Sequence, residues 1–314
     1  MTRKTKKILY WTFGSILLIF IILLVGFMKA APYSAIKPVK FSPQISYSDY
    51  GLKADKFTFT TRDSVKISGV FIKSNRDSAI GTIIMLHGIA SCKESNVNFA
   101  KSFADSGFNA ILLDMRAHGD SGGDYCTFGY YEREDIKEAI DFCLKKYGDI
   151  EPIGITGHSL GGALSIQALS YDKRIKAGCL SGTFARLDDI IRDYMARVTK
   201  VLRFKFISNH ILSQSGEIAN FRPFEVNPEK SAKLVTQPVF IFHGEIDDKI
   251  SPEYGKRVFN NLASPIKEFL LIKNANHDNI FEKGGEGLIK KEIEFMKKNL
   301  HNGDLYKIEK DIAH

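Results

Sequence analysis

The chain has 314 residues, a formal net charge of +8, and 44% hydrophobic and 25% charged residues. This composition is typical of a globular protein with a large buried core and excludes a disordered chain, a collagen-like chain and a repeat array. Arg3, Lys4, Lys6 and Lys7 supply half of the positive excess, and the other basic residues are scattered without interleaved aromatic residues. We therefore expect no nucleic-acid partner.

A basic tail at residues 1–7 precedes an uncharged apolar segment at residues 8–28. The segment is long enough to cross a hydrocarbon core about 30 Å thick, whereas a cleaved signal peptide has an apolar region of only about 7–15 residues. We expect an uncleaved signal anchor, with a cleaved signal peptide as the alternative. Because the basic cluster precedes the span, the N-terminus of this single-pass membrane protein is expected in the cytoplasm and the remainder outside it.

Residues 29–50 contain Pro32, Pro38 and Pro43 and are expected to form an extended tether. A folded domain is expected at residues 51–302, followed by a tail at 303–314. Its first two segments, residues 56–61 and 65–71, alternate and predict an antiparallel strand pair. The later strands are expected at 82–86, 110–114, 153–156, 177–180, 239–243 and 268–272, and the helices at 96–106, 130–147, 253–262 and 288–300. This alternation predicts an α/β fold, a mostly parallel sheet with helices on both faces.

A long interval between the strands at 177–180 and 239–243 interrupts the alternation. Apolar residues recur there at helical spacing from Leu187 to Leu202, with basic residues around them. We expect a small helical cap at about residues 183–236, lying over the strand ends. The alternative is a lengthened surface helix with no role in binding. An apolar face with basic flanks is also what an interfacial helix offers to anionic lipid.

The stretch from Ile153 to Ala163 predicts a nucleophile. It reads as a short apolar strand, then Gly157-x-Ser159-x-Gly161, then a helix. In such an elbow a Cβ at either glycine would collide with the adjacent strand and helix, and the serine is exposed at the tip of a sharp turn. Ser159 is therefore the expected nucleophile, and a glycine- and serine-rich turn without chemistry is the alternative.

A serine nucleophile needs a base, and the base needs an orienting acid. His277 follows the last expected strand in a polar loop and is the expected base. The acid should follow a strand between Ser159 and His277, a condition that both Asp247 and Asp248 meet. The resulting chain order of serine, aspartate and histidine is that of α/β-hydrolases. Four other histidines are expected to brace loops: His87, His118, His158 and His243.

The oxyanion hole is expected to use two backbone N–H groups. One belongs to Leu160, the residue after the nucleophile. The other is that of Ile89, in the loop that begins with His87-Gly88 at the end of the strand at 82–86. The alternative reading is that His87-Gly88 only ends the strand.

Five motifs in chain order resemble those of α/β-hydrolases. They are His87-Gly88, DMRAHGDSGG at 114–123, GHSLGG at 157–162, HGEID at 243–247 and Asn276-His277. The chain is most similar to the membrane-anchored serine hydrolases of the Bem46 and serine aminopeptidase (S33-like) group, over about residues 57–300. The resemblance implies the α/β-hydrolase fold and favours Asp247 over Asp248 as the triad acid.

These residues predict a serine hydrolase of the carboxylesterase or lipase-like type. Ser159 would attack the acyl carbonyl of a small-molecule or lipid substrate, His277 would take its proton, and Asp247 would hold the imidazole. This chemistry implies no metal and no organic cofactor. An S33-type serine aminopeptidase is the alternative enzyme, and a non-catalytic binding module with the hydrolase fold is the alternative from a different class.

The four cysteines show neither a C-x-x-C pair nor zinc spacing. Cys143 and Cys179 lie in apolar patterns and are expected to be core thiols. Cys92 and Cys126 follow neighbouring expected strands, and the sequence leaves open whether they form a disulfide.

Overall fold

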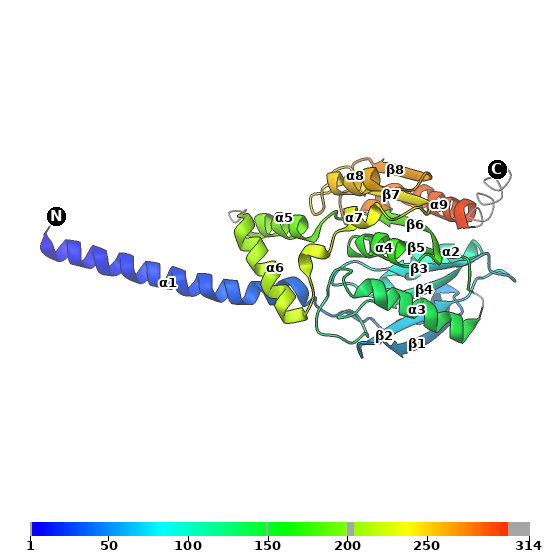
Figure 1. Ribbon diagram of the computed structural model, residues 1–314, viewed down its shortest axis with the longest axis horizontal. Helices are drawn as coiled ribbons and strands as arrows, with labels where there is room; N and C mark the ends of the chain where they lie inside the picture. The colour runs from blue at the N-terminus through cyan, green and yellow to red at the C-terminus, as the bar shows by residue number, and fades with distance from the viewer. Residues whose placement is uncertain (1, 149, 200–203, 301–314) are drawn as a thin grey trace.

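The computed structural model describes residues 2–148, 150–199 and 204–300, so the expected tail at 303–314 lies outside the described residues. Its centre is an eight-stranded sheet with the strand order β1-β2-β4-β3-β5-β6-β7-β8 (Figure 1). Only β2 pairs antiparallel with its neighbours, β1 and β4, and every other pairing is parallel. The strands are β1 (Ala54–Thr60), β2 (Lys66–Ile72), β3 (Thr82–Leu86), β4 (Asn109–Asp114), β5 (Ile153–His158), β6 (Ile175–Ser181), β7 (Val239–Gly244) and β8 (Lys267–Ile272).

Helices cover both faces of this sheet, as the sequence predicts. Successive residues of β3 point to opposite faces because side chains alternate along a strand. Ile84 and Leu86 join the apolar core under one set of helices, and Ile83 and Met85 join the core under the other. The first core is covered by α3 (Glu132–Tyr147), α4 (Leu160–Tyr171) and α8 (Pro252–Asn261), and the second by α2 (Val97–Asp105) and α9 (Ile280–Leu300). The expected fold class, a mostly parallel α/β sheet with helices on both faces, is confirmed.

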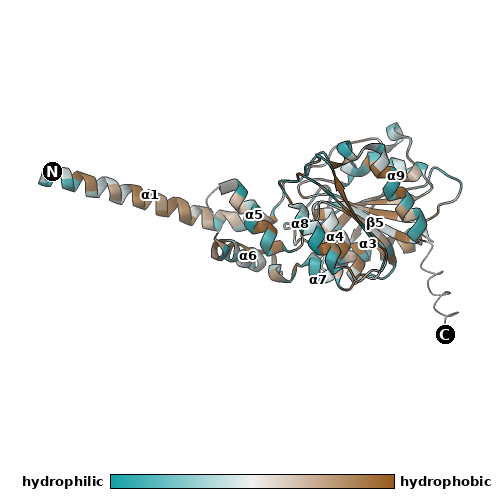
Figure 2. Ribbon diagram, turned by 90° about the horizontal axis from the view of Figure 1, so that it is seen from above, coloured by the Kyte–Doolittle hydropathy of each residue, from teal (hydrophilic) through white to brown (hydrophobic). Residues whose placement is uncertain are grey.

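The insertion after β6 forms the expected helical region, but it contains more than one long helix. Within the described residues it comprises α5 (Leu187–Thr199), α6 (Lys205–Ala219), a 3-10 turn η3 (Pro223–Glu225) and the short α7 (Pro228–Ala232). The helical stripe expected from Leu187 to Leu202 therefore corresponds to α5, and Leu202 lies outside the described residues. In Figures 1 and 2, α5 and α6 lie between the hydrolase-like domain and the N-terminal helix.

The N-terminal helix α1 (Arg3–Ile36) is long and apolar enough to cross a membrane, and its apolar stretch is exposed rather than packed on the domain. Figure 2 shows this apolar stretch extending away from the domain. Such a helix fits a single-pass anchor or a signal sequence.

The expected extended tether at residues 29–50 is corrected by the structure over residues 29–36, whereas residues 37–46 form neither helix nor strand. The helix continues through Pro32 to Ile36, packs against α6, and buries Ile36 completely in the domain core. The Ile36 carbonyl then accepts a hydrogen bond from the Cys126 N–H at 2.8 Å. The three prolines suggested an extended chain, but the tertiary contacts of α1 with α6 and the core override this local preference. The anchor helix is thereby joined to the domain through a packed connection.

All four cysteines are buried and free, so Cys92 and Cys126 form no disulfide. Burial raises the pKa of the Cys143 thiol to about 12, and burial likewise raises the pKa of Cys179 well above its usual value. These two side chains are thus neutral core thiols, as the sequence predicts.

Candidate active site

The turn between β5 and α4 has the geometry expected of a nucleophile elbow. Ser159 has φ 59° and ψ −120°, a left-handed conformation that non-glycine residues rarely adopt. A Cβ built on Gly157 would lie 2.4 Å from the Gly161 backbone, and one on Gly161 would lie 2.3 Å from the Leu86 carbonyl oxygen. Both positions therefore require glycine, because the strand, the turn and the helix approach too closely for any side chain.

The structure brings Ser159, His277 and Asp247 together from three separate segments. The His277 Nε2 atom lies 2.9 Å from the Ser159 hydroxyl, and His277 Nδ1 lies 2.8 Å from Asp247 Oδ2. Because a carboxylate only accepts, Nδ1 carries the proton and Nε2 presents its lone pair to the serine. This arrangement allows the imidazole to act as a general base toward the hydroxyl.

The Asp247 carboxylate is held by several donors at the carboxyl end of β7. Its Oδ1 atom accepts from the backbone N–H groups of Lys249 at 3.0 Å and Ile250 at 2.8 Å. Burial alone would raise the pKa of Asp247, but hydrogen bonds from His243, His277 and the Ile250 N–H outweigh it and hold that pKa well below its usual value. Asp247 is therefore ionised at neutral pH, whereas the Asp248 side chain is exposed to solvent.

The expected oxyanion donors lie at two elements that meet at Ser159. Leu160 is the first residue of α4, so its N–H lies among the unpaired N–H groups at the start of that helix. Gly88 borders the serine from the loop after β3, since a Cβ built on it would lie 3.5 Å from the Ser159 Cβ. Ile89 follows Gly88 in that loop and is partly exposed. The loop carrying Ile89 therefore approaches the serine as expected.

Two buried histidines brace the loop that carries Gly88. His87 Nδ1–H donates to the Gly88 carbonyl at 2.7 Å, and His87 Nε2 accepts from the Met115 N–H at 3.1 Å. Burial lowers the pKa of His87 to about 3, so the ring is neutral at physiological pH. Its ring lies 4.9 Å from that of His118, which is also buried.

His158 packs against the expected base. Its ring centroid lies 4.7 Å from that of His277, and its Nδ1 atom is 2.9 Å from the Ser181 hydroxyl. Burial, followed by the nearby His277, lowers the pKa of His158 to about 3. Gly182 makes room for both rings, because a Cβ there would lie 3.0 Å from His158 Cε1 and 3.2 Å from His277 Cε1. A neutral His158 thus limits the rotation of the His277 ring without adding positive charge beside it.

A buried lysine near the same loop was not singled out from the sequence. Lys93 is 1% exposed, and its Nζ atom lies 2.7 Å from Asp114, 2.7 Å from Asp120 and 3.0 Å from Glu94. Its own N–H donates to Asp114 Oδ1 at 2.7 Å. Lys93 therefore ties the end of the loop that begins at His87 to the loop after β4. A lysine in an otherwise polar stretch gives no periodic signal, so the sequence alone offered nothing to distinguish it from a surface charge.

The cap contacts the loop of Asp247 directly. On α5, the Arg197 guanidinium donates to the Asp248 carbonyl oxygen at 3.1 Å. Also on α5, Asp193 accepts a hydrogen bond of 2.5 Å from the hydroxyl of Tyr254, which lies on α8. The position of the cap is therefore coupled to the segment that presents the acid.

We looked for metal-binding side chains in the described ranges, 2–148, 150–199 and 204–300. No group of three or more His, Cys, Asp or Glu side chains there is placed to hold a metal ion.

Known proteins that resemble this chain have the α/β-hydrolase fold. A family described as the alpha/beta hydrolase fold matches residues 81–235, which include β3, the elbow and the helices of the cap from α5 to α7. Among solved structures, an esterase of Pyrococcus furiosus superposes with a TM-score of 0.71 at 24% identity, over 84% of this chain and 98% of the esterase. This likeness is evidence for the fold.

Two bacterial proteins illustrate the sequence similarity. YqkD of Bacillus subtilis is 26% identical over 225 residues, which are 68% of this chain and 70% of YqkD. YfhR of Escherichia coli K12 is 25% identical over 272 residues, which are 84% of this chain and 88% of YfhR. The similarity therefore extends over most of the chain and is not confined to the elbow.

Proposed function

We propose that this chain, which has the α/β-hydrolase fold, is a serine hydrolase that cleaves an acyl ester, or a related thioester or amide, through an acyl-enzyme on Ser159. The observation that carries the proposal is the continuous hydrogen-bonded path from Ser159 through His277 to Asp247, with 2.9 Å and 2.8 Å links. A hydrolase fold with an esterase among its structural neighbours is consistent with this activity.

The proposed reaction has two half-reactions. In the first, His277 Nε2 takes the Ser159 proton while the serine oxygen attacks the acyl carbonyl, and the imidazolium then protonates the leaving group. Asp247 keeps the proton of His277 on Nδ1 and stabilises the imidazolium. In the second, His277 activates water, which attacks the acyl-enzyme and releases the acid together with free Ser159.

The N–H groups of Leu160 and Ile89 are proposed to bind the oxyanion of each tetrahedral intermediate. Leu160 adds the favourable dipole at the start of α4, whose N-terminus faces the developing negative charge. Loss of one such donor in comparable enzymes costs about 3 kcal/mol of transition-state stabilisation.

The acidic residues of the cap do not favour an aminopeptidase. An aminopeptidase needs a free carboxylate to hold the substrate ammonium, but the carboxylates at the start of α5 already have partners. Asp188 accepts from Arg186 at 2.9 Å, and Asp189 accepts from Arg192 at 2.7 Å and from Arg257 at 3.0 Å. We therefore favour an ester over a peptide as the substrate.

The chemistry is tested with a fluorophosphonate probe on the detergent-solubilised full chain. We expect one labelled site, Ser159, and loss of labelling in Ser159→Ala with unchanged circular dichroism. A non-catalytic binding module with the hydrolase fold would not react with the fluorophosphonate probe. Hydrolysis of p-nitrophenyl esters of increasing chain length, beside aminoacyl p-nitroanilides, then separates an esterase from an aminopeptidase. Faster turnover of the anilides would replace the ester proposal.

We also propose that α1 is an uncleaved single-pass anchor with the N-terminus in the cytoplasm and the catalytic domain outside it. The basic residues before the apolar segment support this orientation. The burial of Ile36 supports an uncleaved helix, since it would make α1 part of the folded protein. Protease added to spheroplasts should digest the domain. Protection until the membrane is permeabilised would indicate the opposite orientation.

A further inference from the structure

The two long helices of the cap carry exposed aromatic side chains on either side of the segment that joins them. Tyr194 on α5 is 55% exposed, Phe204 just before α6 is 55% exposed, and Phe206 in the first turn of α6 is 71% exposed. The rings of Phe204 and Phe206 lie 5.7 Å apart. We call these three residues the cap tip. A cluster of exposed aromatic side chains is typical of a surface that binds a membrane or another protein.

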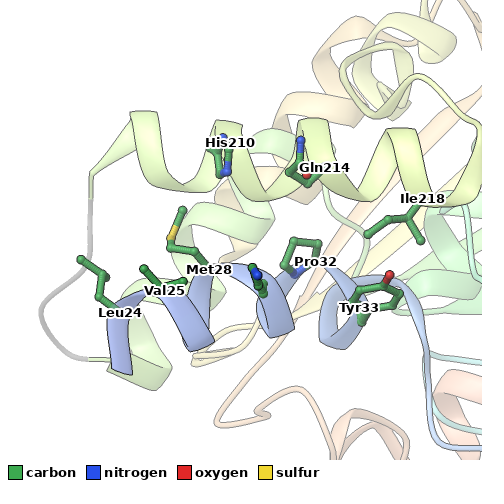
Figure 3. A pocket seen from close by; sticks show the side chains of 9 residues that line it. Leu24, Val25, Met28, Pro32, Tyr33, His210, Gln214 and Ile218 are labelled. Atoms are coloured by element: carbon green, nitrogen blue, oxygen red, sulfur yellow. The ribbon is translucent and has the colours of Figure 1, made fainter. Parts of the chain in front are cut away.

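The cap tip lies beside α1 because α6 runs parallel to α1 along its C-terminal part. Figure 3 shows His210 of α6 opposite Met28 of α1, and Gln214 opposite Pro32. The two helices are joined by the Ser215 hydroxyl, which donates to the Pro32 carbonyl at 3.1 Å. Because Ser215 is fully buried, the alignment of the two helices is fixed by a contact inside the protein.

This alignment sets the depth of the cap tip. Phe206 precedes His210 by one turn, about 6 Å at 1.5 Å per residue, which places it at the level of Leu24, one turn before Met28. The apolar segment at 8–28 is roughly 30 Å long as a helix, the thickness of a hydrocarbon core. Leu24 and Met28 then lie in the outermost turns of that core on the side of the domain.

We propose that the cap tip is a second membrane contact, in which Tyr194, Phe204 and Phe206 are embedded among the phospholipid acyl chains of the leaflet that borders the domain. The groove of about 520 Å³ between α1 and α6 supports this occupant. Its α1 wall includes Leu24, Val25 and Met28, and this wall continues without interruption into the apolar surface of α1. Lipid that surrounds α1 therefore also meets α6.

The charges beside the cap tip fit the same partner. Arg197 lies with its guanidinium 4.7 Å from the centre of the Tyr194 ring, and Lys205 separates Phe204 from Phe206 and is exposed. At this depth a long basic side chain such as that of Lys205 extends toward the headgroup phosphates while its carbon chain stays among apolar groups. The Arg197 guanidinium instead stays on the protein, at the Tyr194 ring and the Asp248 carbonyl. The basic side chains of the cap are thus joined by aromatic side chains at the end that the proposal places nearest the bilayer.

The membrane contact of the cap tip also indicates where the substrate comes from, a conclusion that rests on the proposed function. Arg197, which is next to the cap tip, donates to the carbonyl of Asp248 at 3.1 Å, so the membrane-facing cap borders the loop of the proposed catalytic acid. An acyl lipid held at the cap tip would therefore lie beside the segment that presents the proposed acid. The substrate class is therefore an acyl ester of a membrane lipid.

The test uses tryptophan as a depth reporter, because Trp11 is the single tryptophan of the chain. In the full-length Trp11→Phe protein, Phe206→Trp reports on the cap tip and Leu234→Trp serves as the matched control. Leu234 is 64% exposed, and its carbonyl accepts from Lys173, which lies just before β6, so Leu234 lies near the amino ends of the strands, whereas the cap follows the carboxyl end of β6. Each protein is reconstituted into phosphatidylcholine vesicles with and without brominated acyl chains, and the wild-type Trp11 reports on α1.

We expect blue-shifted emission and at least twofold quenching by brominated lipid for Phe206→Trp and for wild-type Trp11, and water-like emission without quenching for Leu234→Trp. Water-like emission of Phe206→Trp while Trp11 is quenched would overturn the proposal, and so would the absence of quenching at Trp11. Fluorophosphonate labelling of Ser159 is measured in the same samples. Quenching without labelling would retain the membrane contact and reject the proposed hydrolase.

Discussion

The His243 Nε2 atom lies 3.3 Å from Asp247 Oδ2, the same carboxylate oxygen that lies 2.8 Å from His277 Nδ1. His243 Nε2 also lies 2.8 Å from the Ile250 carbonyl, and because a carbonyl only accepts, this nitrogen carries the proton. The His243 Nε2–H group therefore bridges the start and the end of the segment from β7 to Ile250 and also faces Asp247. Asp247 is positioned between two histidines, of which one orients the loop and the other faces the serine.

The first prediction concerns His243 as a positioning residue. We expect His243→Leu to lower kcat/KM about 10- to 100-fold, because the buried Ile250 carbonyl would lose its donor, at a cost of about 1–3 kcal/mol, and the Asp247 loop would shift. His243→Gln retains an N–H donor and should recover part of the loss. The rate of fluorophosphonate labelling should fall with kcat while KM stays close to that of the wild type. A change in KM alone would place the role of His243 in substrate binding.

The second prediction separates the two candidate acids. Asp247→Asn should lower kcat by about 10⁴, because an amide cannot hold the required imidazole tautomer in the same way. Asp248→Asn should stay within about threefold of the wild type, since its side chain is exposed and its contact with Arg197 uses the backbone carbonyl. Steady-state kinetics of both variants on a soluble p-nitrophenyl ester decide between them. A larger loss for Asp248→Asn would move the acid by one residue.

Much of the site could be predicted from the sequence because its residues follow strand ends. The β3 range matches the expected strand, and β5 leads into Ser159 at the elbow. The carboxyl ends of parallel strands share one edge of a sheet, so loops that follow them converge even when they are far apart in sequence. Ser159, Asp247 and His277 lie together for that reason.

The sequence could not predict the contacts that depend on packing between distant segments. Pro32 predicts a break in the helix after residue 28, yet α1 continues to Ile36 because α6 and the core pack against it. The sequence does not predict the pairing of Lys93 with Asp114 and Asp120 either, since this pairing joins two loops across the end of the sheet. Neither feature has a periodicity or a motif that a single sequence reveals.

The third prediction concerns the buried charge of Lys93. Lys93→Met would leave Asp114, which is fully buried, without its counter-ion, and removal of one partner of a buried pair costs about 3–5 kcal/mol. We expect a marked fall in Tm of the solubilised full chain, followed by circular dichroism. Lys101→Met is the control, because its ion pair with Asp105 is exposed and such pairs contribute about 0–1 kcal/mol. Equal Tm values for the two variants would show that Lys93 carries no special structural role.

The last prediction concerns Glu292, a buried carboxyl group on α9 that the proposed mechanism does not use. It is completely buried, its Oε2 accepts from the Thr156 hydroxyl at 3.2 Å, and its Oε1 has no partner among the described residues. Burial raises the pKa of Glu292 from 4.5 to about 8, because the ionised form would lose its hydration without gaining a counter-ion. The folded protein therefore holds Glu292 as a neutral acid at pH 7.

The sign of the pH dependence follows from these two pKa values. Below about pH 4.5 the group is protonated in both the folded and the unfolded chain, so its full stabilising contribution is present. As the pH rises toward about 8 the unfolded chain releases this proton and the folded chain retains it, so the free energy of unfolding falls by about 1.4 kcal/mol per pH unit. Above the folded pKa the loss is complete and the contribution becomes constant.

Glu292→Gln removes this titration while keeping the shape of the side chain and an acceptor for Thr156. We expect the Tm of Glu292→Gln minus that of the wild type to be near zero at pH 5 and to rise steadily up to about pH 8, where Gln is the more stable. Glu294→Gln on the same helix is the control, because Glu294 is exposed and its substitution should give no such pH-dependent difference. A Tm difference for Glu292→Gln that is constant from pH 5 to 8.5 would mean that Glu292 ionises normally in the folded chain. It would then require a positive partner or water beside Oε1, which a high-resolution structure at both pH values would reveal.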